Sequence, residues 1–84
     1  MSFSVKIKAS AAKSLGALPR AERERLAAAI DRLVDEPHAG SALKGEFLGL
    51  RRLRIGRYRI VYEALDRELT VLVVRIGHRR EVYR

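Results

Sequence analysis

The sequence contains no cysteine and no tryptophan, and it has only two prolines, Pro19 and Pro37. Without cysteine the chain can form neither a disulfide nor a cysteine-based zinc site. Its longest aliphatic run, Val71–Val74, is far shorter than the ~20 apolar residues that a membrane-spanning helix needs. Residues 1–6 also lack the apolar core of a secretory signal. We therefore expect a cytoplasmic protein that has no membrane partner.

Acidic residues are few, with ten Asp and Glu against eighteen Lys and Arg, and the net charge is +8. The excess lies in the second half. Residues 1–42 contain seven basic and five acidic side chains, whereas residues 43–84 contain eleven and five, and ten of those eleven are arginine. Such an uneven positive charge indicates a polyanionic partner, which can be a nucleic acid, an anionic membrane or an acidic protein. Arginine in particular favours bidentate contact with phosphate.

The chain of 84 residues has room for one domain, because a domain usually contains ~100–200 residues. Alternating apolar residues predict a strand at 3–7. Two amphipathic helices follow; Ser10 is expected to cap the first, and Pro19 to occupy the first turn of the second. After a loop at 38–45, strands are predicted at 50–55, 58–64 and 69–76. The sequence thus predicts a single α+β domain over residues 1–84, with two N-terminal helices packed on one face of a small, mainly antiparallel sheet (β-α-α-β-β-β).

Arginine occupies five of the nine positions between residues 51 and 59. Apolar side chains alternate with them in two neighbouring strands, so that the apolar set is expected to face the core. The set on the opposite side of the sheet is here called the arginine face, and it consists of Arg52, Arg54, Arg57 and Arg59. Guanidinium groups on an open sheet can hold a phosphate backbone. The alternative is a solvated basic surface that keeps a small protein soluble.

The residues after the last predicted strand add further polar groups, which we expect to emerge beside the arginine face. Arg79 and Arg80 can neutralise phosphate charge, and Tyr83 can stack on a base or accept a proton. His78 is a candidate proton shuttle, because histidine commonly acts as a general acid and base. For each of these residues a structural role is the alternative.

The acidic residues do not converge on a metal site. Glu63, Asp66 and Glu68 flank a predicted hairpin turn, whereas a two-metal nuclease needs carboxylates that meet. The chain also lacks a glycine-rich phosphate loop and a zinc-type histidine pair. We therefore expect no metal and no cofactor. If such a protein cuts nucleic acid, RNA is the expected target, because its 2′-hydroxyl supplies an internal nucleophile.

Two stretches of this chain resemble the RelE/ParE superfamily of bacterial and archaeal type II toxins. They are Gly56-Arg57-Tyr58-Arg59-Ile60-Val61-Tyr62 and Gly77-His78-Arg79-Arg80-Glu81-Val82-Tyr83. The opening strand, the two helices and Leu15-Gly16-Ala17-Leu18-Pro19 also fit the superfamily, so the resemblance extends over nearly the whole chain. It implies a toxin of a type II toxin–antitoxin system. RelE-type members are endoribonucleases that cut mRNA in the decoding site of the ribosome, and ParE-type members poison DNA gyrase.

The resemblance also implies roles for individual residues. Arg59 would stabilise the scissile phosphate, Arg79 would assist with the same charge or with the leaving group, and Tyr83 would orient the nucleotide and activate the 2′-hydroxyl. Arg52 and Leu50 stand where RelE-type enzymes carry two lysines, and arginine is a poor base. The general base therefore has no evident equivalent, and Lys44 is the candidate replacement. The expected RNA-binding residues are Arg52, Arg54, Arg57, Arg80 and Lys44.

The partners that the resemblance implies are a cognate antitoxin and the ribosome with its mRNA, while DNA would be contacted only indirectly, through the antitoxin. Three functions remain open from the sequence. The first is an endoribonuclease that needs no metal, the second is a gyrase-poisoning toxin without chemistry of its own, and the third is an inactive basic binding module. The combination of Arg59, Arg79 and Tyr83 favours the first, because a gyrase binder has no evident need for it.

Overall fold

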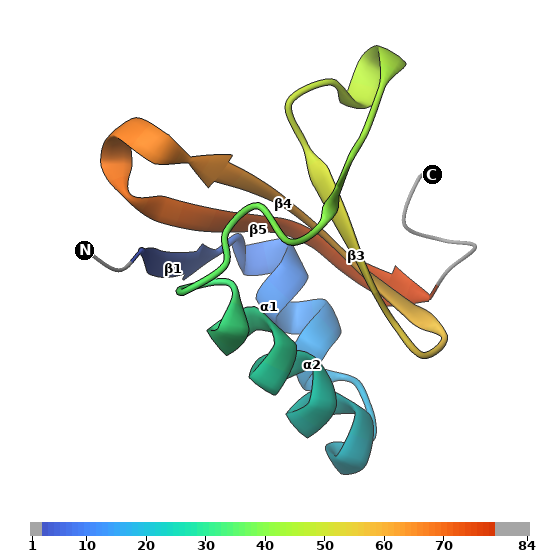
Figure 1. Cartoon of the computed structure of the whole chain (residues 1–84). Helices are drawn as coiled ribbons and strands as arrows, with labels where there is room; N and C mark the ends of the chain where they lie inside the picture. Colours follow the sequence, from blue (N-terminus) through green and yellow to red (C-terminus); the bar gives the residue numbers. More distant parts are fainter. Residues whose placement is uncertain (1–2, 79–84) are drawn as a thin grey trace.

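A computed structural model of the chain describes residues 3–78, which form a five-stranded sheet with two helices against one face (Figure 1). The helices are α1 (Ala9–Gly16) and α2 (Arg20–Arg32). The strands are β1 (Ser4–Ile7), β2 (Ser41–Ala42), β3 (Arg51–Ile55), β4 (Tyr58–Leu65) and β5 (Thr70–His78), and two short 3-10 turns, η1 (Gly45–Phe47) and η2 (Asp66–Glu68), lie in the connections. This arrangement confirms the predicted α+β fold class.

The strands are ordered β1-β5-β4-β3-β2, so that β5 lies between the first strand and the β4–β3 hairpin. β1 pairs with β5 in parallel, and the remaining pairs are antiparallel. The β4–β5 pairing shifts by one residue between Val61 and Tyr62, because Val61 pairs with Arg75 and Tyr62 with Val73, which leaves Val74 outside the register. This β-bulge leaves Val73 and Ile76 in the core but turns Arg75 out into solvent.

Helix α2 holds its place through one apolar stripe. Leu26, Ala29 and Ile30 are buried on it, and Leu33, just past the helix, continues the stripe into the core. The helix begins one residue later than expected, because Pro19 is its N-cap residue rather than part of the first turn. In α1 the expected cap Ser10 is wrong. Lys8 occupies the N-cap position, and Ser10 lies within the helix, where its carbonyl accepts a hydrogen bond from Ser14 Oγ.

Tyr62 ties the sheet to the segment that follows α2. Its hydroxyl accepts a hydrogen bond of 2.8 Å from the Gly40 N–H, and Arg51 Nη1 donates 2.9 Å and 3.3 Å bonds to the carbonyls of Gly40 and His38. Burial raises the pKa of the Tyr62 phenol, although the Gly40 hydrogen bond and the charge of Arg51 oppose that effect. Arg51 is thus occupied in fastening a loop, which the composition of residues 51–59 does not reveal.

Two local expectations differ from the structure. The predicted loop at 38–45 contains β2, whose two residues pair with Arg51 and Arg52. Ile7, predicted to face the core with Phe3 and Val5, is 36% exposed at the end of β1. Both differences arise from edge positions, where a short strand is stabilised by its neighbour rather than by its own pattern. None of the helices formed by residues 3–78 has the length and apolarity to cross a membrane.

Candidate functional site

The strand register brings three of the predicted arginines onto the sheet face opposite the helices. Arg54 of β3 and Arg59 of β4 are direct cross-strand partners, and Gly77 of β5 completes that row. Arg52 lies in the next row, opposite Val61. Their neighbours along the strands point the other way, because Leu53, Ile55 and Ile60 belong to the core. Two rows of the sheet therefore present arginine on one face, as the alternation predicts.

Arg59 is buried rather than exposed, which corrects the expectation that it stands on an open surface. Only 9% of the residue is accessible, whereas its partner Arg54 is exposed. The difference follows from the strand order, because β4 has β3 on one side and β5 on the other, and β3 lies nearer the edge. Burial of a guanidinium group fixes its position and lowers the dielectric constant around it. Arg59 is therefore the best-positioned cation of this face.

Arg57 and Lys44 lie at opposite ends of β3. Arg57 is in the tight turn between β3 and β4, where Gly56 has a φ of +58°, and it is exposed beside Arg25 and Glu22 of α2. The expectation that Arg57 projects from a strand is therefore wrong. Lys44 precedes η1 in the loop that leads into β3 at Arg51, away from the end that carries Arg54. The loop projects from the sheet in Figure 1. The structure does not bring Lys44 and Arg57 together.

His78 closes β5 in the same row as Tyr58, and their rings meet edge to face with centroids 6.1 Å apart and planes inclined at 79°. Since Tyr58 packs against the core, this row places His78 on the face that carries the helices. Its predicted role as a proton shuttle stays a prediction. Arg79, Arg80 and Tyr83, which complete the predicted site, lie outside the described residues.

Arg75 is a cation of this face that the sequence analysis missed. Residues 69–76 are nearly all apolar, and strict alternation from the buried Val73 would turn Arg75 toward the core. The bulge instead places Arg75 opposite Val61, in the row of Arg52. A β-bulge depends on the pairing between two distant segments, so the sequence of one strand indicates it only weakly. The indication here is a charged residue at a position where strict alternation predicts a buried one.

Residues 3–78 contain no group of three or more His, Cys, Asp or Glu side chains that could hold a metal ion. The polar groups that converge within this part of the chain are cations. Such an arrangement can bind phosphate and can stabilise negative charge that develops on it.

Comparison with known proteins places these features in a family. The family described as the ParE toxin of the type II toxin–antitoxin system parDE matches residues 5–83. The chain is 33% identical over 90 residues to Toxin RelG of Mycobacterium tuberculosis, with 100% of this chain and 99% of the relative covered. It is 30% identical over 84 residues to a putative RelE-like toxin protein of Escherichia coli, with 94% and 85% covered.

The fold is also similar to that of a solved toxin–antitoxin complex. The crystal structure of RelBE2 from M. tuberculosis superposes with a TM-score of 0.87 at 28% sequence identity, and the match covers 94% of this chain and 100% of the other. The two chains therefore share this fold over nearly their whole length.

Proposed function

Because this chain belongs to the ParE toxin family of type II toxin–antitoxin systems, we propose that it acts as a RelE-type toxin that cleaves mRNA on the ribosome. The observation that carries the proposal is the buried Arg59, paired across the sheet with Arg54 and followed in the next row by Arg52 and Arg75. A cation held in this way is suited to a developing phosphorane charge. The likeness to a putative RelE-like toxin supports the same assignment.

In the proposed reaction the 2′-oxygen of the RNA bonds to the adjacent phosphorus, and the bond from phosphorus to the 5′-oxygen breaks. The proton of the 2′-hydroxyl passes to a base, and the departing 5′-oxygen takes up a proton. The products are a 2′,3′-cyclic phosphate and a 5′-hydroxyl end. Arg59 would stabilise the extra negative charge on the phosphoryl oxygens, while Arg52 and Arg54 would hold the neighbouring phosphates.

Arg79 and Tyr83 would complete the constellation, Arg79 at the charged phosphate or the leaving oxygen and Tyr83 at the nucleotide and its 2′-hydroxyl. Arg57, Arg80 and Lys44 would contribute to RNA affinity. No cofactor or metal takes part in the proposed mechanism. Arginine stays protonated at the pH of the cell, so the base must be another group. The candidates to be tested are Tyr83, Lys44 and His78, of which His78 lies on the helix side of the sheet and not on the side of Arg59.

We further propose that a cognate antitoxin neutralises the protein in the cytoplasm, since the similar M. tuberculosis structure is a toxin–antitoxin complex. The antitoxin would cover the arginine face or pack on the helices. Contact with DNA would then be made through the antitoxin alone, and the ribosome with its mRNA would be the target of the free toxin.

Purified ribosomes programmed with a defined mRNA provide the test. We expect in-frame cuts on addition of the protein, with 2′,3′-cyclic phosphate and 5′-hydroxyl ends. Cleavage should not depend on a transition metal when magnesium is held constant. The same mRNA without ribosomes should stay intact.

The gyrase-poisoning alternative is favoured by one observation, which is that the matching family is named for ParE. Pulse labelling after induced expression separates the two. An early stop in protein synthesis supports the endoribonuclease. An early stop in DNA synthesis, with intact mRNA, would transfer the assignment to gyrase poisoning.

A further inference from the structure

Glu63 is the one acidic residue in the five described strands, and it lies on the side of the sheet that carries the arginine face. The sequence analysis grouped it with Asp66 and Glu68 at a turn, whereas the structure places it within β4. Its neighbour Tyr62 is buried in the core, so the alternation of the strand directs Glu63 to the opposite face. The carboxylate therefore shares a face with Arg59.

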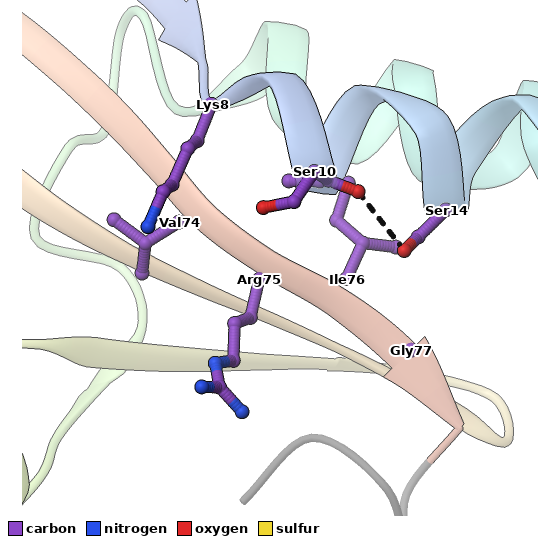
Figure 2. Close-up of a pocket in the computed structure, with 8 residues that line it drawn as sticks. Lys8, Ser10, Ser14, Val74, Arg75, Ile76 and Gly77 are labelled. Carbon is purple, nitrogen blue, oxygen red and sulfur yellow. Dashed lines mark hydrogen bonds between the residues drawn. The ribbon is translucent and has the colours of Figure 1, made fainter.

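Val61 lies midway between Arg59 and Glu63 on β4, and its row shows which way all three residues face. The cross-strand partners of Val61 are Arg52 of β3 and Arg75 of β5. Figure 2, which views the pocket between α1 and β5, shows the Arg75 side chain extending away from α1. The row therefore faces the side opposite the helices, and at ~3.3 Å per residue the Cα atoms of Arg59 and Glu63 lie ~7 Å from that of Val61, in opposite directions.

Arg52 links the two ends of this line. Because it stands opposite Val61, it is a diagonal neighbour of both Arg59 and Glu63. Diagonal neighbours in an antiparallel pair are ~7–8 Å apart, which is within reach of long side chains. A phosphate held by Arg52 and Arg59 can thus have its ribose directed toward Glu63.

The Glu63 carboxylate is half-buried, and among residues 3–78 it forms no hydrogen bond or ion pair. An acid that only balanced the charge of the arginines would be expected to pair with one of them. An ionised carboxylate accepts protons, whereas arginine and protonated lysine only donate them. His78, the other described candidate that can accept a proton near neutral pH, lies on the helix side of the sheet.

We propose that Glu63 is the general base of the cleavage reaction. It takes the proton of the 2′-hydroxyl while the 2′-oxygen bonds to phosphorus; the bond from phosphorus to the 5′-oxygen breaks, and that oxygen takes its proton from another group. Glu63 then releases its proton to water. The attacking and leaving oxygens lie roughly in line on opposite sides of phosphorus, so a base at one end of the site serves the attack alone. This proposal rests on the RNA-cleaving function proposed above, for which it supplies the base.

The test separates the base from the group that protonates the leaving oxygen. Single-turnover cleavage by the full chain is measured on ribosomes programmed with two mRNAs, one natural and one with sulfur in place of the leaving 5′-oxygen. Sulfur departs without being protonated, so it restores a variant that lacks the acid but not one that lacks the base. The variant is Glu63→Gln. Glu68→Gln is the matched control, because Glu68 is an exposed acid in η2 and its replacement changes the charge equally.

We expect Glu63→Gln to cleave both mRNAs about 100-fold more slowly, as loss of a general base typically does. Its affinity for ribosomes carrying an uncleavable 2′-O-methyl mRNA should stay within about twofold of the wild type, since an unpaired acid contributes little to binding. Glu68→Gln should behave like the wild type, and melting temperatures show whether each variant is folded. Glu63→Ala gives a second readout, because added formate should restore part of its cleavage by supplying a carboxylate.

Four results would overturn the proposal. If folded Glu63→Gln cleaves at the wild-type rate while Arg59→Ala is slow, Glu63 is not the base and the proposed function stands. If sulfur restores Glu63→Gln, the residue serves the leaving oxygen instead. If Glu63→Gln loses affinity in proportion to activity, and formate leaves Glu63→Ala inactive, its role is structural. If the wild type cuts neither mRNA, the proposed function fails together with this proposal.

Discussion

Arg59 is the residue on which the proposed chemistry depends most, because the sheet holds it in place. Its burial between β3 and β5 restricts the side chain before any RNA arrives. Replacement by alanine should lower single-turnover cleavage on programmed ribosomes by on the order of 100- to 1,000-fold, as removal of one preorganised donor does in other enzymes. Arg57→Ala, in the exposed turn, should mainly weaken affinity, and Arg79→Ala and Tyr83→Phe should rank after Arg59→Ala.

Because Arg59 is buried, its replacement can also destabilise the fold, so the melting temperature of Arg59→Ala must be measured beside its activity. Arg59→Lys keeps the charge but not the planar fork, and it should remain impaired if bidentate contact is needed. A folded Arg59→Ala protein that cleaves at the wild-type rate would contradict the site assignment and leave the fold untouched.

Gly40 illustrates a second residue whose identity is dictated by its surroundings. A Cβ atom at this position would lie 2.7 Å from the Arg52 carbonyl oxygen and 2.8 Å from the Tyr62 hydroxyl. Gly40→Ala should therefore lower the free energy of unfolding by about 1–3 kcal/mol, the usual effect of overpacking. Gly16→Ala is the matched control, since a Cβ there meets nothing within 4 Å. Urea denaturation of both variants checks the difference, and equal stabilities would contradict the contact geometry.

The phenol of Tyr62 makes stability depend on pH. The pKa of this phenol is higher in the folded protein than in the unfolded chain, where it is about 10. Its contribution to the free energy of unfolding is therefore fully present below about pH 10 and is lost as the pH rises through the pKa of the folded state. Tyr62→Phe leaves the Gly40 N–H without this acceptor and should cost about 1–3 kcal/mol near neutral pH. Urea titrations from about pH 8 to 11 should show that the difference in free energy of unfolding between the wild type and Tyr62→Phe becomes smaller as the pH rises. A difference that stays constant over this pH range would contradict the raised pKa of Tyr62.

At the scale of elements, α2 stays on the sheet by packing rather than by its surface charges. The ion pairs Arg20–Glu24 and Glu22–Arg25 on this helix involve mostly exposed side chains, and such pairs contribute little. Leu26 is fully buried, so Leu26→Ala should destabilise the protein by about 2–5 kcal/mol. Leu48→Ala, at a residue that is 80% exposed, should change stability by less than about 0.5 kcal/mol. Thermal unfolding of the Leu26→Ala and Leu48→Ala variants measures both effects.

The elements with strong periodicity were predictable, and those that depend on distant pairing were not. Leu26, Ala29 and Ile30 recur at helical spacing, and the residues of β3 and β4 alternate, so the helices and the hairpin followed from local pattern. The strand β2 has two residues and exists only through its pairing with β3. The bulge that exposes Arg75 and the burial of Arg59 likewise arise between strands. The structure therefore confirms the sheet face predicted for Arg52, Arg54 and Arg59 and adds Arg75 to it, while the function of that face stays a prediction.

At the scale of the whole molecule, the net charge of +8 should make RNA binding strongly dependent on salt. The logarithm of the association constant should fall linearly with the logarithm of salt concentration, with a slope of about −0.7 for each phosphate neutralised on a single strand. Arg52→Gln and Arg54→Gln should each reduce that slope by about 0.7. Fluorescence anisotropy titrations with a 2′-O-methyl oligonucleotide at several salt concentrations measure this slope. An unchanged slope would show that these arginines do not contact phosphate.

The strand order has a consequence for synthesis. β5 contacts β1, β4 and α1, and the partners of Ser4–Ile7 are Thr70–Val73, so the first and the last described strands must meet. When translation has reached the end of β4, the segments that form β1, both helices and the β3–β4 hairpin have been synthesised, but β5, which pairs with both β1 and β4, has not. Arg59 then has a neighbour on one side only. A messenger truncated before the codons of β5 should thus yield a polypeptide that lacks the proposed site, and we expect its expression to leave cell growth unchanged.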